Sequence, residues 1–387
     1  MNTRARPQPD RPPSLAVVNA AEYEAAGLYD PAAHDAADRL ALLEYFTSRG
    51  LTIDEMLHAE RNGLLLAAAG DALVRRGREL PLVEVAEASG LSVELLRRVL
   101  EAAGVVGPDG EEPRLLEGDV PFFVTFRAGM EVFGEESIVQ LTRVIGSAVA
   151  QVAEAGLSLF HMNVERSLYE QQASQRALAE ANVAAVGALE ALESALSGML
   201  RLHFEAAQRR TRRAYQSDGR FGWLRMAVGF VDLVGFTPLA HRLAHDELAA
   251  VIEDFGSRAH AVVTAHGGRI VKYMGDEVMF VTPVAAVACQ IALGMVDVFR
   301  ARDTRIEPHG AIAFGSVLAR AGDYYGPLVN LAARVADIAV PGEILVSEDV
   351  QREAVGAEAL AFEPAGRRML KGFDEPVALW SVSRAGA

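Results

Sequence analysis

The chain has 387 residues, of which 51% are hydrophobic and 23% charged, and its formal net charge is −15. This length predicts two or three domains with ample material for packed cores. The acidic balance argues against a general binder of nucleic acid or anionic membranes, because such a surface repels phosphates. A single cysteine, Cys289, excludes an internal disulfide and is expected to be a small core residue in a reducing compartment.

Residues 1–35 contain four prolines between Arg6 and Pro13 and little apolar periodicity, so we expect a mobile N-terminal arm there. The apolar stretch after Ser14 is too short for the core of a signal peptide. No apolar run approaches the roughly 18–20 residues of a transmembrane helix. These features predict a cytoplasmic protein without membrane insertion.

Residues 36–208 carry apolar side chains at three- and four-residue spacing, as in Leu40, Leu43 and Phe46, which predicts an all-helical domain. Its second half, from about Glu135 to Ala207, is rich in alanine and predicts long helices. Their apolar spacing favours a bundle with a substantial helix–helix or dimer interface.

The segment Val83–Val99 has the spacing of a helix–turn–helix, with Gly90 in the turn. Two interpretations are open, a DNA-recognition helix and a helical hairpin of a regulatory domain. Its second helix offers only Arg97 and Arg98 for phosphate contacts, next to acidic neighbours. We therefore favour the hairpin and expect no nucleic acid as a partner.

Residues 209–223 form a basic connector that is poor in apolar residues, and its arginines are Arg209, Arg210, Arg212, Arg213 and Arg220. His203 lies just before them, and a protonated imidazole beside these cations would favour a different arrangement of the connector. A proton input through His203 and a more buried His161 is one hypothesis for regulation. A small apolar ligand near Phe122, Phe123 and Phe126 is another, and ordinary helix or core residues are the simpler interpretation of both groups.

From Met226 the pattern changes to short β-like runs that alternate with helical stretches, which indicates an α/β arrangement in residues 224–387. The expected strands are residues 227–231, 277–281, 311–317, 344–346 and 377–382.

Asp232 stands at the end of the first of these strands, within Phe230–Thr237. A glycine turn follows it, and a helix is expected to start at Thr237. Backbone amides at such a helix start hold phosphate oxygens, so Phe236 and Thr237 are candidate substrate-binding residues.

Asp276 lies at the predicted bend of a hairpin within Gly267–Glu277. Two aspartates on neighbouring strand ends, Asp232 and Asp276, suit two hard divalent cations, which prefer oxygen ligands and triphosphate. An aspartate that caps a turn is the alternative for either one.

A third motif, Gly322–Arg334, places Asn330 and Arg334 one helical turn apart on one face of a helix. A buried-facing Asn and Arg on an otherwise apolar helix are costly unless an anionic or polar group meets them. The pair therefore predicts a binding function.

Together these residues resemble the class III adenylyl and guanylyl cyclases over about residues 224–383. The resemblance implies a ferredoxin-like α/β sandwich in an α+β protein, and a homodimer whose two sites are each shared between protomers. It also implies two Mg²⁺ or Mn²⁺ ions per site. By position it assigns metal binding to Asp232 and Asp276, purine recognition to Lys272 and Asp323, transition-state contacts to Asn330 and Arg334, and a triphosphate contact to Lys371.

The base-recognition residues predict ATP as the substrate. Adenine presents an acceptor at N1 and a donor at N6, which are complementary to the ammonium of Lys272 and the carboxylate of Asp323. Guanine reverses both groups, and unpaired buried groups of this kind discriminate strongly. The expected product is 3′,5′-cyclic AMP. The N-terminal region is similar to the helical regulatory domains of actinobacterial soluble cyclases.

Two functions other than catalysis by a class III cyclase are alternatives. One is a DNA-binding regulator whose cyclase-like half only senses nucleotide, and the complete set of metal, base and transition-state residues argues against it. The other is a diguanylate cyclase, which resembles the motif around Asp276 but would not need Asn330 and Arg334. A guanylyl cyclase would be expected to carry different residues at positions 272 and 323.

Overall fold

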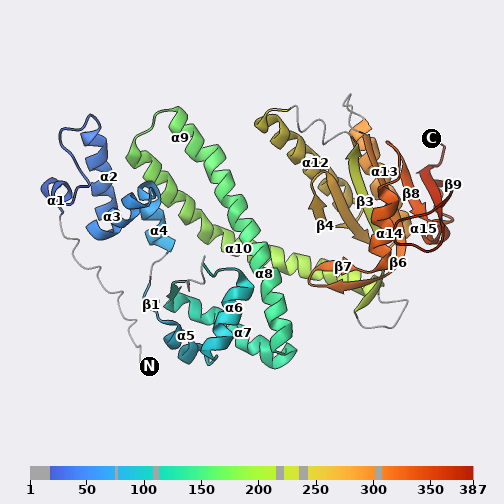
Figure 1. Ribbon diagram of the computed structural model, residues 1–387, viewed down its shortest axis with the longest axis horizontal. Coiled ribbons are helices and arrows are strands. Elements are labelled where there is room, and N and C mark those ends of the chain that lie inside the picture. The colour runs from blue at the N-terminus through green and yellow to red at the C-terminus, as the bar shows by residue number, and fades with distance from the viewer. Residues whose placement is uncertain are drawn as a thin grey trace, which may run out of the picture. The chain divides into compact units, whose positions relative to one another are not determined.

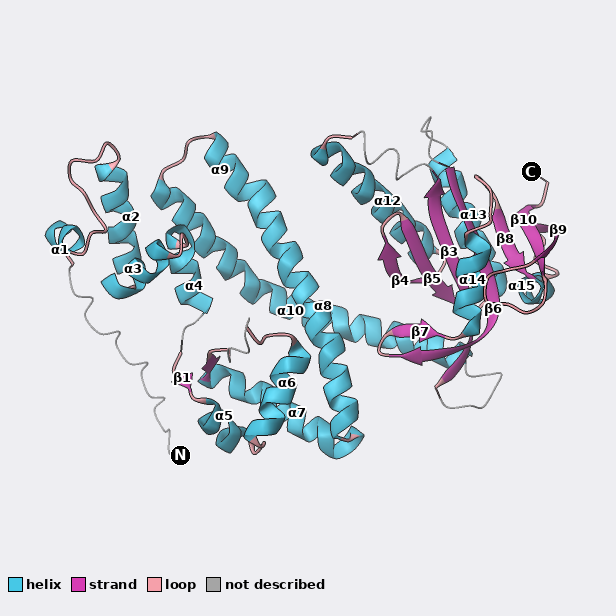
Figure 2. Ribbon diagram, in the orientation of Figure 1, coloured by secondary structure: helices cyan, strands magenta, loops and turns pink. Residues whose placement is uncertain are grey.

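The computed structural model describes residues 18–74, 77–107, 113–214, 222–234, 243–300 and 307–386. The chain divides into two compact parts, a helical unit (residues 1–199) and a sheet unit (residues 200–387) (Figure 1). Helices make up the first and a mixed sheet with helices the second (Figure 2). The α+β fold class expected from the sequence is confirmed.

The first helices of the helical unit share a core of aromatic and aliphatic side chains, which includes Tyr23, Leu42, Leu43, Phe46 and Met56. These helices are α1 (Ala20–Ala25), α2 (Ala36–Ser48), α3 (Ile53–Arg61) and α4 (Ala68–Val74). Tyr23 is fully buried, and its hydroxyl lies 3.2 Å from the carbonyl oxygen of Leu43. The expectation of a mobile arm over residues 1–35 is therefore corrected for residues 20–28, because the proline cluster ends at Pro13 and does not reach α1.

A second group of helices packs around a short two-stranded sheet of β1 (Glu79–Leu80) and β2 (Leu115–Leu116). It contains α5 (Leu82–Ser89), α6 (Val93–Ala103) and α7 (Val120–Phe133). Gly90 has φ +72° between α5 and α6, so the predicted helix–turn–helix spacing is present as two helices and a tight turn. Arg98 of the second helix pairs with Glu135 and Glu136, which leaves it poorly suited to bind phosphates.

Long helices complete this part of the chain. They are α8 (Glu135–Phe160), a π-helical turn at His161–Glu165, α9 (Arg166–Glu170) and α10 (Gln175–Ala214). By length and composition alone, the stretches 135–170 and 175–214 could each cross a membrane. This differs from the sequence expectation that no apolar run was long enough. Both stretches contain ionisable side chains, such as Arg143 and Glu154 of α8.

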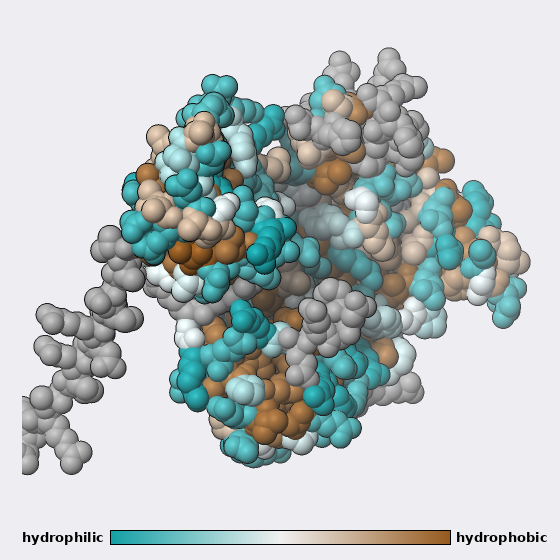
Figure 3. All heavy atoms as spheres, turned by 60° about the vertical axis from the view of Figure 1, so that its left-hand side comes forward, coloured by the Kyte–Doolittle hydropathy of each residue, from teal (hydrophilic) through white to brown (hydrophobic). Residues whose placement is uncertain are grey.

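Large apolar side chains remain exposed along these helices and on α7. Figure 3 shows brown, hydrophobic surface among teal surface on the lower part of the molecule, where α5–α7 lie in Figure 1. On α8 and α10 the exposed side chains include Leu141, Ile145, Val149, Leu157, Leu159, Met199, Leu200, Leu202 and Phe204. Phe123 and Phe126 are core residues, whereas Phe122 is 46% exposed.

The sheet unit is built on one sheet with the strand order β4-β5-β3-β6-β8-β10-β9, and β7 pairs with the end of β6. Among the strand pairings of the described residues, that of β6 with β8 is parallel and the others are antiparallel. The strands are β3 (Trp223–Val234), β4 (Arg269–Met274), β5 (Glu277–Thr282), β6 (Glu307–Arg320), β7 (Asp323–Tyr325), β8 (Ile344–Ser347), β9 (Leu360–Arg368) and β10 (Val377–Arg384). All five strands expected from the sequence are present.

Two apolar cores cover the two faces of this sheet, as strand alternation requires. On one face, Ala227, Val231 and Leu233 of β3 pack with α12 (His245–Ala265), α13 (Ala285–Arg300) and α15 (Glu348–Ala354). On the other, Met226, Val228 and Phe230 pack with α14 (Pro327–Ala336). The buried Cys289 belongs to the first core, as its sequence context predicts.

Candidate functional site

Asp232 follows Phe230 by two residues in β3, so its side chain lies on the α14 face of the sheet. It is half-buried, and the backbone N–H of Leu233 donates to its Oδ1 over 2.8 Å. Burial raises the pKa of Asp232, and the negative charge of Asp276 raises it further. The strand end therefore presents a carboxylate whose charge is only partly balanced.

Asp276 lies in the two-residue turn between β4 and β5, where Met274 pairs with Glu277. Gly275 has φ +69° at the first turn position, a conformation that glycine adopts without steric cost. The sequence prediction of a hairpin with Asp276 at the bend is confirmed. The turn brings this carboxylate close enough to Asp232 for the two charges to interact.

A third carboxylate, Glu277, joins these two aspartates. Burial, followed by the charges of Asp232, Asp337 and Asp276, raises the pKa of Glu277 to about 7. Converging, partly desolvated carboxylates of this kind suit a hard divalent cation, which prefers oxygen ligands and relieves their repulsion. The described residues include no group of three or more His, Cys, Asp or Glu side chains arranged around one metal position. A cation held by Asp232 and Asp276 would complete its coordination with phosphate or water oxygens.

Lys272 and Asp323 form a direct ion pair on the same face of the sheet. Nζ of Lys272 lies 2.6 Å from Oδ2 of Asp323, and the N–H of Tyr324 donates to Oδ1 over 2.7 Å. The ammonium and the carboxylate are 42% and 23% exposed, so both remain accessible to a ligand. The structure brings together the two residues that the sequence proposed for purine recognition, although they are distant in sequence.

Asn330 and Arg334 lie on α14, which begins after Gly326 with Pro327 at its first position. The opposite face of α14 is apolar and buried through Ala332, Val335 and Ala336. Both polar residues are exposed, so the expectation that they face the protein interior is wrong. The guanidinium of Arg334 donates to Asp337 over 3.0 Å.

The remaining candidates are less well defined by the structure. Phe236 and Thr237 lie outside the described residues. Lys371 is exposed in the turn between β9 and β10, directly after the buried Leu370.

Sequence reasoning missed Glu277 and Asp337 as members of this charged group. Glu277 directly follows Asp276, and its place on the same strand face as Met279 indicates where it points. Asp337 lies three residues after Arg334, a spacing typical of ion pairs on a helix. Both signals are visible in the sequence once the strand and the helix are placed.

Two basic side chains of the sheet unit lie beside the Lys272–Asp323 pair. Arg269 of β4 donates to the carbonyl oxygen of Gly322 over 2.7 Å. Arg210 belongs to the helical part of the predicted connector, and burial lowers its pKa, with the charge of Arg269 lowering it further. The last residue of α10, Ala214, is buried in the same core as Tyr324. Residues 209–214 of the predicted connector form the last part of α10.

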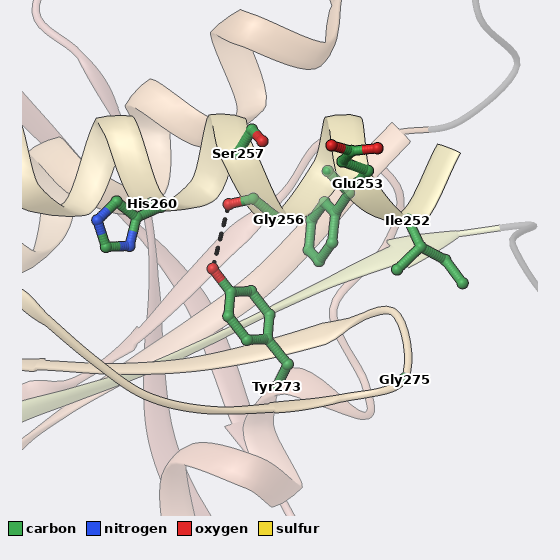
Figure 4. Close-up of a pocket in the computed structure, with 8 residues that line it drawn as sticks. Ile252, Glu253, Gly256, Ser257, His260, Tyr273 and Gly275 are labelled. Carbon is green, nitrogen blue, oxygen red and sulfur yellow. Dashed lines mark hydrogen bonds between the residues drawn. The ribbon is translucent and has the colours of Figure 1, made fainter. Parts of the chain in front are cut away.

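A pocket of about 660 Å³ lies between α12 and β4, on the opposite side of β4 from Lys272 (Figure 4). Tyr273 and Lys272 are neighbours in the strand and so point to opposite faces. The Tyr273 hydroxyl donates to the carbonyl oxygen of Gly256 over 3.1 Å, as the dashed line in Figure 4 shows. The charged residues described above do not line this pocket.

The two histidines considered as proton sensors lie on exposed helix surface. His203 is exposed on α10. His161 is also exposed and contacts Glu165 within the π-helical turn, so it is not a buried titrating group.

Comparison with known proteins agrees with this division of the chain. Residues 21–207 match the family described as adenylate cyclase regulatory domain, and residues 224–383 match the adenylate and guanylate cyclase catalytic domain. An uncharacterized protein of Mycobacterium tuberculosis is 34% identical over 92% of this chain and 91% of its own length. An adenylate cyclase of Streptomyces coelicolor is 33% identical over 76% of this chain and 78% of its own length. A pH-sensitive adenylate cyclase of M. tuberculosis is 28% identical over 90% of this chain and 88% of its own length.

Proposed function

We infer the function of this chain from its family, because it belongs to the adenylate cyclases with an N-terminal regulatory domain. We propose that it converts ATP to 3′,5′-cyclic AMP and pyrophosphate. In this proposal two copies of the chain share each site, and the helical unit regulates them.

The observation that carries the choice of ATP is the Lys272–Asp323 pair. Nζ and Oδ2 are 2.6 Å apart and partly exposed, so they offer one donor and one acceptor side by side. The N1 acceptor and the N6 donor of adenine match this arrangement, and guanine presents the reverse. Guanine would leave the ammonium and the carboxylate without matching partners, which selects against GTP.

The remaining residues position the substrate and meet developing charge. Asn330 orients the ribose, and Arg334 contacts the α-phosphoryl oxygens as their charge grows in the transition state. Lys371, Phe236 and Thr237 are proposed to contact the triphosphate. Asp232 and Asp276 would hold two divalent cations, Mg²⁺ or Mn²⁺, which when bound supply the Lewis acidity that activates the ribose 3′-hydroxyl and neutralises pyrophosphate.

Two features support a site that is shared between copies. Asn330 and Arg334 are exposed on α14 and so can reach a partner subunit. The exposed apolar side chains of α8 and α10 provide surface that a second copy would cover.

Regulation by protons is the favoured role for the helical unit, because its sequence matches a cyclase regulatory domain and one relative is described as pH-sensitive. The activity of the full chain, His203→Ala and His161→Ala is to be compared between about pH 5.5 and 8, with His34→Ala as the exposed control. A changed profile in His203→Ala or His161→Ala alone supports the proposal. Identical profiles for all four proteins contradict a proton input through these histidines.

The proposed activity is tested by incubating the full chain with ATP or GTP and either Mg²⁺ or Mn²⁺, followed by chromatography of the nucleotides. We expect cyclic AMP and pyrophosphate in equal amounts and far less cyclic GMP. Asp276→Ala serves as the inactive control. Nucleotide binding without a cyclic product would contradict the proposal and favour a nucleotide sensor.

A further inference from the structure

The carboxylate of Asp323 follows a two-residue turn with an unusual backbone. Arg320 pairs with Asp323 across the β6–β7 hairpin, so the turn consists of Ala321 and Gly322. Their φ angles are +51° and +77°, and both residues are thus left-handed. Glycine adopts this conformation freely, but the Cβ of alanine is crowded by its own backbone. The position of Asp323 therefore depends on a turn that Ala321 disfavours.

A β-bulge in β4 places two cations above this turn. Arg269 pairs with Val281 and Lys272 pairs with Met279, so Val271 is the additional residue in β4. In a regular strand, residues three apart point to opposite faces, whereas the bulge returns Arg269 and Lys272 to the same face. Both side chains consequently reach the β6–β7 hairpin.

Arg269 contacts the residues on both sides of Asp323. Its guanidinium donates to the carbonyl oxygen of Gly322 over 2.7 Å and lies 5.8 Å from the centre of the Tyr324 ring. The Tyr324 side chain is buried, so this ring is a fixed support. Arg269 thus holds the turn before Asp323 and packs on the strand after it, while Lys272 contacts the carboxylate itself.

We propose that Arg269 is a positioning residue for base selection, which holds the Ala321–Gly322 turn in its left-handed form and so keeps Asp323 beside Lys272. This inference rests on the proposed function, because it assumes that Lys272 and Asp323 recognise the base. In this inference Arg269 acts through the turn rather than through contact with the base.

The test uses full-length Arg269→Ala, Arg269→Lys, Ala321→Gly and the double variant Arg269→Ala/Ala321→Gly. Arg352→Ala is the control, because the Arg352 side chain is paired with Asp349 and Glu348 of its own helix, α15. For each protein, kcat and KM are measured with ATP and with GTP, together with the thermal midpoint.

Loss of the Gly322 hydrogen bond in Arg269→Ala should raise KM for ATP about tenfold and lower the ATP preference over GTP by a similar factor, with a smaller change in kcat. Arg269→Lys retains a donor and should lie between wild type and Arg269→Ala. Ala321→Gly favours the left-handed turn on its own, so the double variant should recover most of the ATP preference. Arg352→Ala should match wild type.

An Arg269→Ala variant with a lower thermal midpoint but unchanged KM and base preference would overturn the inference, as would a double variant with no recovery. If the wild-type chain makes no cyclic nucleotide, the proposed function fails separately. Displacement of a fluorescent nucleotide analogue by ATP and GTP then gives the decisive measurement. Equal ATP-to-GTP affinity ratios in wild type and Arg269→Ala would overturn the positioning role.

Discussion

The ammonium of Lys272 on β4 lies 2.6 Å from the carboxylate of Asp323 on β7, although 51 residues separate them. Two hairpins that are far apart in sequence meet at this contact, and within its own hairpin Asp323 also accepts a hydrogen bond from the backbone N–H of Tyr324. An ion pair that is still partly exposed contributes little to folding. In the proposed function, this pair presents one donor and one acceptor to a planar base.

Removal of either member of this pair should weaken the reaction with ATP and reduce base selectivity. We expect kcat/KM for ATP to fall roughly 10- to 100-fold in Lys272→Ala and in Asp323→Ala, because one base edge loses its partner and the other group is left unpaired. The ratio of ATP to GTP turnover should fall as well. Glu353→Ala, which breaks the Arg225–Glu353 ion pair elsewhere in the sheet unit, is the matched control. Unchanged selectivity in both variants would contradict the assignment.

Asp232→Asn should abolish catalysis without loss of folding. Asparagine keeps the Oδ1 that accepts the Leu233 N–H but removes the charge that burial and Asp276 disfavour. Cyclic AMP production should fall at least about 100-fold, and the thermal midpoint in EDTA should equal or exceed that of wild type. Asp349→Asn, an exposed partner of Arg352, controls for loss of a carboxylate. Substantial activity in Asp232→Asn with Mg²⁺ or Mn²⁺ would exclude Asp232 as a metal ligand.

Much of the site was predictable because its chemistry sits in short motifs at the ends of strands. The hydrophobic period located β3, β5 and α14, and the polar or charged residues in and beside these apolar runs pointed to Asp232, Asp276, Asn330 and Arg334 as candidates. Gly275, directly before Asp276, was sufficient to predict the hairpin, because glycine is typical of tight turns that require a positive φ. The φ of Gly275 is indeed positive.

What could not be predicted depends on irregular backbone. The bulge at Val271 moves the side chain of every following residue in β4 to the opposite face of the sheet. No residue type in the strand predicts this bulge. A left-handed Ala321 contradicts local propensity, so the contact from Arg269 to Gly322 could not be inferred. The exposure of Asn330 was misjudged because a polar residue on an apolar helix has the same sequence pattern whether it faces a core or a partner subunit.

Cys289 should be unreactive in the folded protein. Burial raises the pKa of its thiol to about 12, so at pH 8 the thiolate fraction is on the order of 10⁻⁴. Reaction with 5,5′-dithiobis(2-nitrobenzoate) at pH 8 should be very slow for the native chain and rapid in guanidinium chloride, with one thiol per chain. Because the pKa of this thiol is raised by folding, the free energy of unfolding should decline as the pH rises above about 8.5. In that range the thiol ionises in the unfolded chain but not in the folded chain. Rapid labelling of the native chain would show that Cys289 is accessible.

Mixed dimers give the sharpest test of a site shared between subunits. Asp232→Asn lacks a proposed metal ligand and Arg334→Ala lacks the cation that is proposed to meet the α-phosphate, so each protein alone should be inactive. A dimer that contains one copy of each has one site with every group intact and one site with both defects. Random subunit exchange makes half of all dimers mixed, and each has one working site of two, so the activity should reach about a quarter of wild type.

The matched control combines two defects on the same side of the shared site. Lys272→Ala mixed with Arg334→Ala should show no recovery beyond the activity of the separate proteins, because both residues come from the subunit that supplies the base and transition-state contacts. Asp232→Asn mixed with Lys272→Ala should recover as the first mixture does. Differently tagged subunits purified through both tags verify that exchange has occurred. Mixed dimers without activity in the first combination, or equal recovery in the control, would mean that one subunit supplies all groups of its own site.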